Sequence, residues 1–287
     1  MARIACSPLT WTDVLYEHVL DDVAGAGYGG VEASTTAMEA FARQMGRLRA
    51  LLEERSLTLT AVPFSATYFE RDQRQEELEH LRRLADFLAE VAGQGFVVCR
   101  TVPHPARRDL VAGQPPLLPL DPYRLGHLCE SLNRYGDLCA GFGLRAVIAN
   151  RVGSYLEAPD ELEAVLEQTE PELVGFAPDI GHWTYAGGDP AALVRAHRER
   201  IIYPRLKDFD QAVFEQVKGA HQGIADFVRA GGFKELGAGS LDLRAVLLPL
   251  VEADYDGWLC VELELTERTP RESATISREF LGEQFHW

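Results

Sequence analysis

Two apolar stretches decide the fold: GWLCVEL at residues 257–263 and RAVIAN at residues 145–150. Each is an almost continuous apolar run, which is what a strand needs when both faces of its sheet are covered. Short runs of this kind recur from one end of the chain to the other. The eight strands that they predict cover residues 4–7, 30–33, 57–62, 96–101, 144–149, 173–178, 201–207 and 258–263.

Longer segments with a helical period separate these strands. In one of them Leu81, Leu84 and Leu88 recur at three or four residues, while charged residues fill the other face. Eight βα units in 287 residues predict a (β/α)8 TIM barrel. An open doubly wound sheet is the alternative. It is disfavoured because the first βα junction reads CSPLTW (residues 6–11) instead of a glycine-rich phosphate loop.

Two connections exceed what a minimal barrel needs. Residues 104–122, after the fourth strand, are rich in Pro and Arg, and residues 208–240, after the seventh, contain helical stretches. Without a repeat or a linker, residues 1–287 read as a single domain with a long insertion at about 208–240. Two local signals are also testable: Thr36 with Glu39 resembles a capping box, and Pro249 should kink or shorten its helix.

Charge and cysteine content exclude several classes of protein. The chain has 28 Lys and Arg against 44 Asp and Glu, a net charge of −16, which opposes binding to nucleic acid or to an anionic membrane. Five cysteines without a CxxC pair favour a reducing compartment over a disulfide framework. No signal peptide and no transmembrane run is recognisable, so a cytoplasmic protein is expected.

Polar residues follow the expected strands at their carboxyl ends, where the active site of a TIM barrel lies. For Glu32 and Glu264 a helix cap or an ion pair is the favoured interpretation. For Asp179 and His182, which share one short βα loop, a functional role is favoured. The residues at these strand ends are Glu32, Asn150, Arg151, Asp179, His182, Arg205, Lys207, Asp208, Glu262 and Glu264. The other histidines and Cys260 are expected to be structural.

Several motifs resemble one family. They are IACSPLTW (4–11), AGYGGVE (26–32), PDIGHWTYAGGDP (178–190), RLKD (205–208), LGAGSLDL (236–243) and YDGWLCVELE (255–264). Together they resemble the sugar-phosphate isomerase/epimerase superfamily of xylose isomerase-like TIM barrels, and within it the inosose dehydratases. The resemblance spans nearly the whole chain.

The resemblance implies a divalent metal, Mn, Co or Mg, held by carboxylates and a His at the strand ends. The metal polarises a carbonyl while an acid–base pair moves the neighbouring proton. The family's Asp ligand falls on Asp179 and its last Glu ligand on Glu262. Its substrate-binding His falls on His182, and its Lys on Lys207.

Departures from this pattern affect the metal. The ligand His of the family is Arg205 here, and a guanidinium has no lone pair to offer. The strand-five Glu falls on Val147, and Ala149-Asn150-Arg151 replaces a His-x-His. A weakly bound Mn, Mg or Co is one interpretation. No cofactor is the other, with Arg205 lying between Asp179 and Glu262 in the metal's place.

The sequence therefore predicts a dehydratase-like lyase or an isomerase. It would abstract a proton next to the carbonyl of a small polyhydroxylated or keto substrate, with little or no metal, in a specialised biosynthetic pathway. Glu262 or His182 would be the base, Lys207 the proton donor and Arg205 the electrostatic stabiliser. The expected substrate-binding residues are Trp11, Glu32, Asn150, Arg151 and Asp208.

Three alternatives remain at this stage. The chain could be a non-catalytic member that binds a ligand or partner, because ligand loss is what a decayed site looks like. It could be an ordinary metal-dependent sugar isomerase or epimerase. A DNA-repair endonuclease on the same barrel is disfavoured by the acidic surface. A homo-oligomer is also open, since the apolar end FHW (285–287) could pack on the barrel or on a second copy.

Overall fold

A computed structural model describes residues 1–70, 72–108 and 110–287, and it confirms the barrel. Its eight-stranded parallel sheet has the order β6-β5-β4-β3-β2-β1-β10-β7. The two ends of this order meet through parallel bridges from Phe176 to Ile201 and from Asp179 to Arg205, which close the sheet on itself. The strands are β1 Arg3–Cys6, β2 Gly30–Glu32, β3 Thr58–Ala66, β4 Phe96–Thr101, β5 Arg145–Ile148, β6 Val174–Phe176, β7 Arg205–Leu206 and β10 Trp258–Val261.

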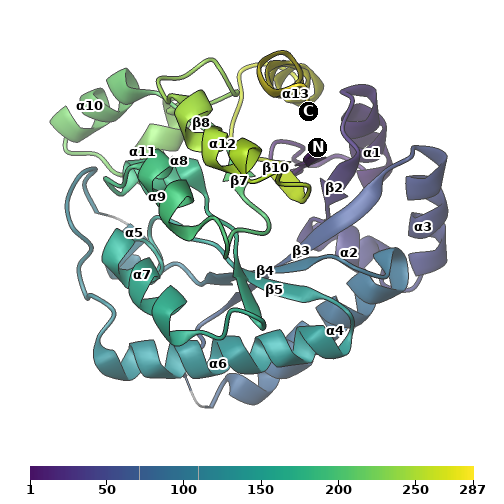
Figure 1. Cartoon of the computed structure of the whole chain (residues 1–287), viewed down its shortest axis with the longest axis horizontal. Helices are drawn as coiled ribbons and strands as arrows, with labels where there is room; N and C mark the ends of the chain where they lie inside the picture. The colour runs from purple at the N-terminus through teal and green to yellow at the C-terminus, as the bar shows by residue number, and fades with distance from the viewer. Residues whose placement is uncertain (71, 109) are drawn as a thin grey trace.

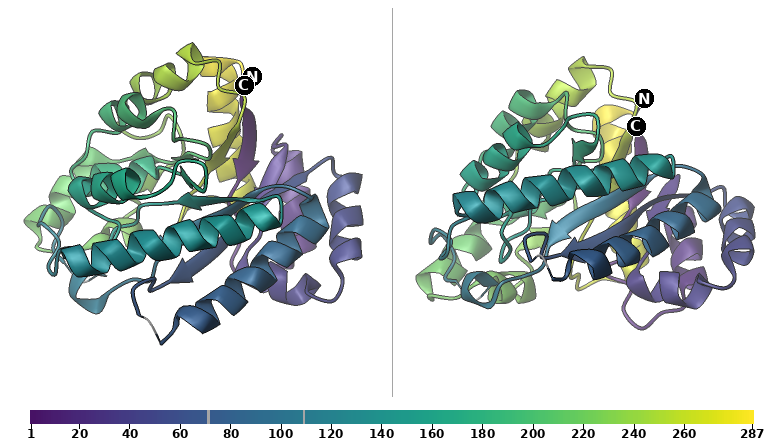
Figure 2. Two further views of the ribbon diagram at one scale, coloured as in Figure 1. Left: turned by 60° about the horizontal axis from the view of Figure 1, so that its bottom comes forward. Right: turned by 90° about the horizontal axis from the view of Figure 1, so that it is seen from below.

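Helices surround the barrel (Figure 1). They are α1 Tyr16–Gly25, α2 Thr35–Phe41, α3 Met45–Glu54, α4 Arg74–Ala92, α5 Pro105–Arg108, α6 Pro122–Gly141, α7 Pro159–Gln168, α8 Ile180–Tyr185, α9 Pro190–His197, α10 Gln211–Gly219, α11 Ile224–Arg229, α12 Leu243–Glu252 and α13 Pro270–Phe285. The long helices α4 and α6 lie side by side over the same part of the sheet, and the two termini lie close together (Figure 2).

The two enlarged connections pack against each other. The insertion after β7 holds α10, α11 and a small antiparallel pair, β8 Asp208–Phe209 with β9 Phe233–Lys234. The connection after β4 reaches it through an antiparallel bridge between Val111 and Gly223, and the Ala112 N–H donates to the Gln222 carbonyl at 2.8 Å. The expected helical stretches are thus present. Residues 104–122 and 208–240 together form a layer beside the open end of the barrel, which we call the roof.

The expected cap of α2 was wrong, and α12 continues past its proline. Ser34, not Thr36, caps α2, and its Oγ accepts from the Ala37 N–H at 3.1 Å. Pro249 lies inside α12, and this helix continues to Glu252. A proline costs a helix one hydrogen bond, and burial of the apolar face of α12 offsets that loss.

The barrel interior is layered. Small side chains such as Ala5, Ala61 and Val98 fill its centre, and the rings of Phe96 and Tyr203 stack with centroids 4.6 Å apart. All five cysteines are buried free thiols, as expected. Across the described helices, none is both long and apolar enough to cross a membrane.

Candidate active site

Because side chains alternate between the two faces of a strand, a row of charged side chains points into the carboxyl end of the barrel. Side chains two residues apart on a strand share a face. Below the rim this face carries Tyr203 and Cys260, which belong to the packed interior. Further along come Arg205 on β7 with Lys207 directly after that strand, and Glu262 directly after the neighbouring β10, followed by Glu264. The pattern that fills the barrel therefore also aims these four charges at one another.

The ammonium of Lys207 lies at the centre of this group. Its Nζ is 2.7 Å from Glu262 Oε1, 2.9 Å from Glu264 Oε1 and 3.1 Å from Asp179 Oδ2. The side chain is completely buried, and its ammonium lies 5.0 Å from the centre of the Phe233 ring. One buried cation thus neutralises part of the charge of three carboxylates.

Arg205 links the two sides of the barrel. Its guanidinium binds both oxygens of Glu32, with Nη2 and Oε2 3.0 Å apart, and Nη2 also contacts Glu262. Arg100 adds a contact of 3.3 Å to Glu262. The expectation that Arg205 lies between Asp179 and Glu262 was correct for Glu262 and wrong for Asp179. Lys207 binds Asp179, and the bidentate partner of Arg205 is Glu32.

The loop after β6 is fixed by its own hydrogen bonds. Asn150 donates from Nδ2 to the Asp179 carbonyl at 3.1 Å, and its Oδ1 accepts from the Asp179 N–H at 2.8 Å. Asp179 in turn caps α8 by accepting from the His182 N–H at 3.1 Å. Asn150 therefore positions the loop that carries both Asp179 and His182. This is a supporting role.

His182 and Glu264 form a buried pair, with Nε2 and Oε1 3.0 Å apart. His182 Nδ1 accepts from the Val152 N–H at 3.4 Å, so the ring proton is assigned to Nε2, facing Glu264. Burial lowers the pKa of His182, although Asp179 and Glu264 oppose that shift. The imidazole is therefore neutral at pH 7. The second oxygen of Glu264 has no hydrogen-bond partner among the described residues.

Neighbouring cations keep the buried carboxylates ionised. Burial by itself raises the pKa of Glu32, but the Arg205 guanidinium brings it down to about 2. Burial likewise raises the pKa values of Asp179 and Glu264, but Lys207 and His182 together hold them below their ordinary range. The cluster thus consists of ionised acids with cations at contact distance, enclosed by protein.

These residues do not fit a transition-metal site. Arg205 takes the place of the ligand His and cannot donate a lone pair. The carboxylates of Asp179 and Glu262 already contact Lys207 and Arg205, and a divalent ion among them would meet two buried positive charges. In the described part of the chain, no three His, Cys, Asp or Glu side chains are arranged to hold a metal.

Three of the expected substrate-binding residues lie apart from this cluster or at its edge. Trp11 donates from its indole N–H to Asp22 at 2.9 Å. The Asp208 carboxylate accepts from four backbone N–H groups, those of Phe209, Gly237, Gly239 and Leu241, and so shapes the insertion. Arg151 is half-buried, and its charge acts on Arg100 and Glu264. The expected residues that do belong to the cluster are Glu32, Asn150, Asp179, His182, Arg205, Lys207 and Glu262.

Two members of the cluster were missed as functional residues. Glu264 was expected to be a cap or an ion-pair partner, and it does pair with Lys207, but it also binds His182. Its spacing of two from Glu262 was the available signal. Arg100 was not singled out, because nothing in FVVCRT marks it as different from an exposed strand-end arginine.

Comparison with known proteins supports the fold. A family model described as Xylose isomerase-like TIM barrel matches residues 20–284. The inosose dehydratase of Geobacillus kaustophilus is 26% identical over 298 residues, covering 99% of this chain and 95% of that one. The inosose dehydratase of Clostridium tetani is 25% identical over 296 residues, covering 98% of this chain and 97% of its own length.

Solved structures share the fold. The "probable 3-DHS dehydratase AsbF involved in the petrobactin synthesis from Bacillus anthracis" aligns with a TM-score of 0.77 at 14% identity, covering 99% of this chain and all of that one. The IolI protein "with a binding zinc atom" aligns with a TM-score of 0.75 at 15% identity, covering 98% and 97%.

The chain belongs to the xylose isomerase-like TIM barrel family. The family and its dehydratase relatives identify it as an enzyme of the isomerase and carbon–oxygen lyase kind.

Proposed function

We propose that this enzyme removes water from a small polyhydroxylated keto compound, by abstracting the proton next to the carbonyl, with little or no dependence on a divalent metal. The relatives named inosose dehydratase support a keto-polyol as the substrate class. One observation carries the mechanism: the buried cations Lys207 and Arg205 contact the carboxylates on which the family places its metal.

The cations supply the positive charge that the reaction needs. Proton loss next to a carbonyl places negative charge on the carbonyl oxygen, and preorganised donors stabilise it. The Lys207 ammonium contacts three carboxylates, which hold its positive charge at the centre of the cluster, where it would stabilise the developing negative charge. Arg205 is held charged because Glu32 keeps its pKa above the ordinary value in spite of burial.

Of the two expected bases, the geometry favours His182 over Glu262. Glu262 contacts Lys207, Arg205 and Arg100, and a carboxylate among three cations is a weak base. His182 is neutral, and its Nδ1 lone pair would take the substrate proton in exchange for the 3.4 Å contact from the Val152 N–H. Glu264 accepts the Nε2–H and would stabilise the imidazolium that forms. The leaving hydroxide on the next carbon takes a proton from Lys207 or the imidazolium and departs as water.

Proton exchange and water loss test this function. The protein is incubated with inososes and other keto-polyols in D2O, with and without a chelator, and the products are analysed by NMR and mass spectrometry. We expect deuterium next to the carbonyl and a dehydrated product, with most turnover surviving chelation. Activity that disappears on chelation and returns with Mn²⁺ or Co²⁺ would contradict metal independence.

A further inference from the structure

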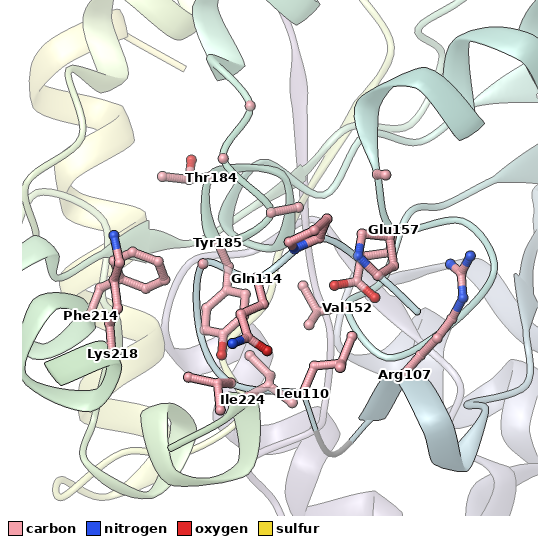
Figure 3. Close-up of a pocket in the computed structure, with 18 of the residues that line it drawn as sticks. Arg107, Leu110, Gln114, Val152, Glu157, Thr184, Tyr185, Phe214, Lys218 and Ile224 are labelled. Carbon is pink, nitrogen blue, oxygen red and sulfur yellow. The ribbon is translucent and has the colours of Figure 1, made fainter. Parts of the chain in front are cut away.

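A cavity of about 520 Å³ lies outside the barrel centre, under the roof formed by residues 104–122 and the insertion after β7 (Figure 3). The bridge between Val111 and Gly223 ties these two segments together. None of the charged residues of the active-site cluster lines the cavity. Helix α8 serves both places, because it contributes His182 to the cluster and Tyr185 to the cavity wall.

Buried polar groups line one side of this cavity. Glu157 is only 6% exposed, and its Oε2 accepts from the Gly153 N–H at 2.9 Å. Burial raises the pKa of Glu157, so this carboxyl favours a hydrogen-bonding partner. Tyr185 is 5% exposed, and its hydroxyl has no hydrogen-bond partner among the described residues. Gln114 also lines the cavity.

Lys218 lies on the opposite side of the cavity from Glu157 (Figure 3). A Cβ on Gly113 would come within 3.1 Å of Lys218 Cε, so this glycine makes room for the lysine stem. Lys218 makes no ion pair within the described ranges, whereas Arg107, the other cation of the wall, is paired with Glu161. Lys218 is therefore the cation here that is available to an anionic ligand.

Apolar side chains complete the wall. Val152, Phe214 and Ile224 border the cavity between the polar groups. A flat apolar body fits against such a surface, because pockets for small molecules combine apolar walls with a few polar groups that set orientation.

We propose that this cavity is a second small-molecule site, which takes a ring compound bearing a carboxylate at one end and a hydroxyl at the other. The carboxylate binds Lys218, the ring lies on Val152 and Ile224, and the hydroxyl donates to the Glu157 carboxyl.

Calorimetric titration of the full chain with two matched probes tests the site. The probes are 4-hydroxybenzoate and 4-hydroxybenzyl alcohol, which differ chiefly in the carboxylate. We expect the acid to bind about tenfold more tightly than the alcohol, as a charge-assisted hydrogen bond allows. Lys218→Met should abolish this difference. Equal affinity of the two probes, no binding of either, or an unchanged preference in Lys218→Met would overturn the proposal.

Two controls separate this site from the active site. Lys234→Met removes another lysine of the same insertion, one that lies 3.6 Å from Asp210, and should leave both affinities unchanged. Turnover of the keto-polyol is measured in the Lys218→Met enzyme. We expect an unchanged kcat, and a lost kcat would show that the cavity is part of the reaction site, against a separate one.

Discussion

Among the described side chains, two fully buried arginines bind glutamates, and they differ in how completely they are paired. Arg107 binds Glu161 and donates to the carbonyls of Ser154 and Leu118, at 2.7 Å each. Glu161 accepts further from backbone N–H groups. Arg205 binds Glu32 and Glu262, but its Nε has no partner among the described residues.

The difference separates a structural ion pair from a functional one. Arg107 and Glu161 neutralise each other and join the roof to α7, so this pair leaves no unpaired charge for a ligand. Around Arg205 the cluster holds four carboxylates, with an unpartnered oxygen on Glu264. Buried groups that lack partners cost stability, and proteins retain them mainly where function needs them.

The largest expected effect is on stability, and it should be equal at both arginines. Arg107→Ala and Arg205→Ala each leave a buried carboxylate unpaired, which should lower the free energy of unfolding by about 3–5 kcal/mol. Urea unfolding measures this. Arg145→Ala is the control, because this exposed arginine makes one hydrogen bond of 3.3 Å to a backbone carbonyl. A loss as small as that of the control at either buried position would show that its ion pair is not structural.

Turnover should distinguish the two regions next. Lys207→Met removes the central donor and should lower kcat by about 10²–10³-fold, the usual cost of losing one preorganised donor. Arg107→Lys, assayed in its folded fraction, should retain the kcat of the parent enzyme. Equal kcat losses in both variants would mean that the contrast between the clusters is not functional.

Acid stability should reveal the depressed carboxyl of Glu32. Its folded-state pKa of about 2 lies below the ordinary 4.5, so its contribution is present above pH 4.5 and is lost as the pH falls toward 2. The difference corresponds to about 3 kcal/mol. Unfolding curves of the parent and Glu32→Gln between these pH values should converge at the acid end. Parallel curves would contradict the assignment.

The smallest effect is a displacement of the acid limb of the pH–rate profile. His182 acts as a base only when neutral, so kcat/KM should fall as the pH drops through its lowered pKa. Lys207 lowers and Glu264 raises that pKa. Glu264→Gln should therefore move the limb to lower pH, and residual activity in Lys207→Met should show it at higher pH. A limb that stays in place in both variants would exclude His182.

The strands were predictable because each is buried on both faces, which forces an apolar run that can be read locally. The residues at the strand ends were predictable for the same reason, since a polar residue that ends such a run reaches the rim. Their pairing was not predictable. The partner of Arg205 lies 173 residues away at Glu32, and that of Lys207 lies 57 residues away at Glu264.

The cap of α2 and the cavity under the roof were not predicted, for another reason. Ser34 and Thr36 are both good helix caps, and packing of α2 decided between them. The cavity under the roof depends on two segments about a hundred residues apart, so neither segment alone indicates it.

The sequence by itself determined that eight buried strands alternate with helices, and that polar residues follow these strands at their carboxyl ends. Both are properties of single positions or of short periodic runs. Only the tertiary structure decided that Arg205 binds Glu32, that His182 pairs with Glu264, and that a cavity lies under the roof. These depend on closure of the barrel, which brings distant strand ends to hydrogen-bond distance and removes the water that would otherwise solvate each charge.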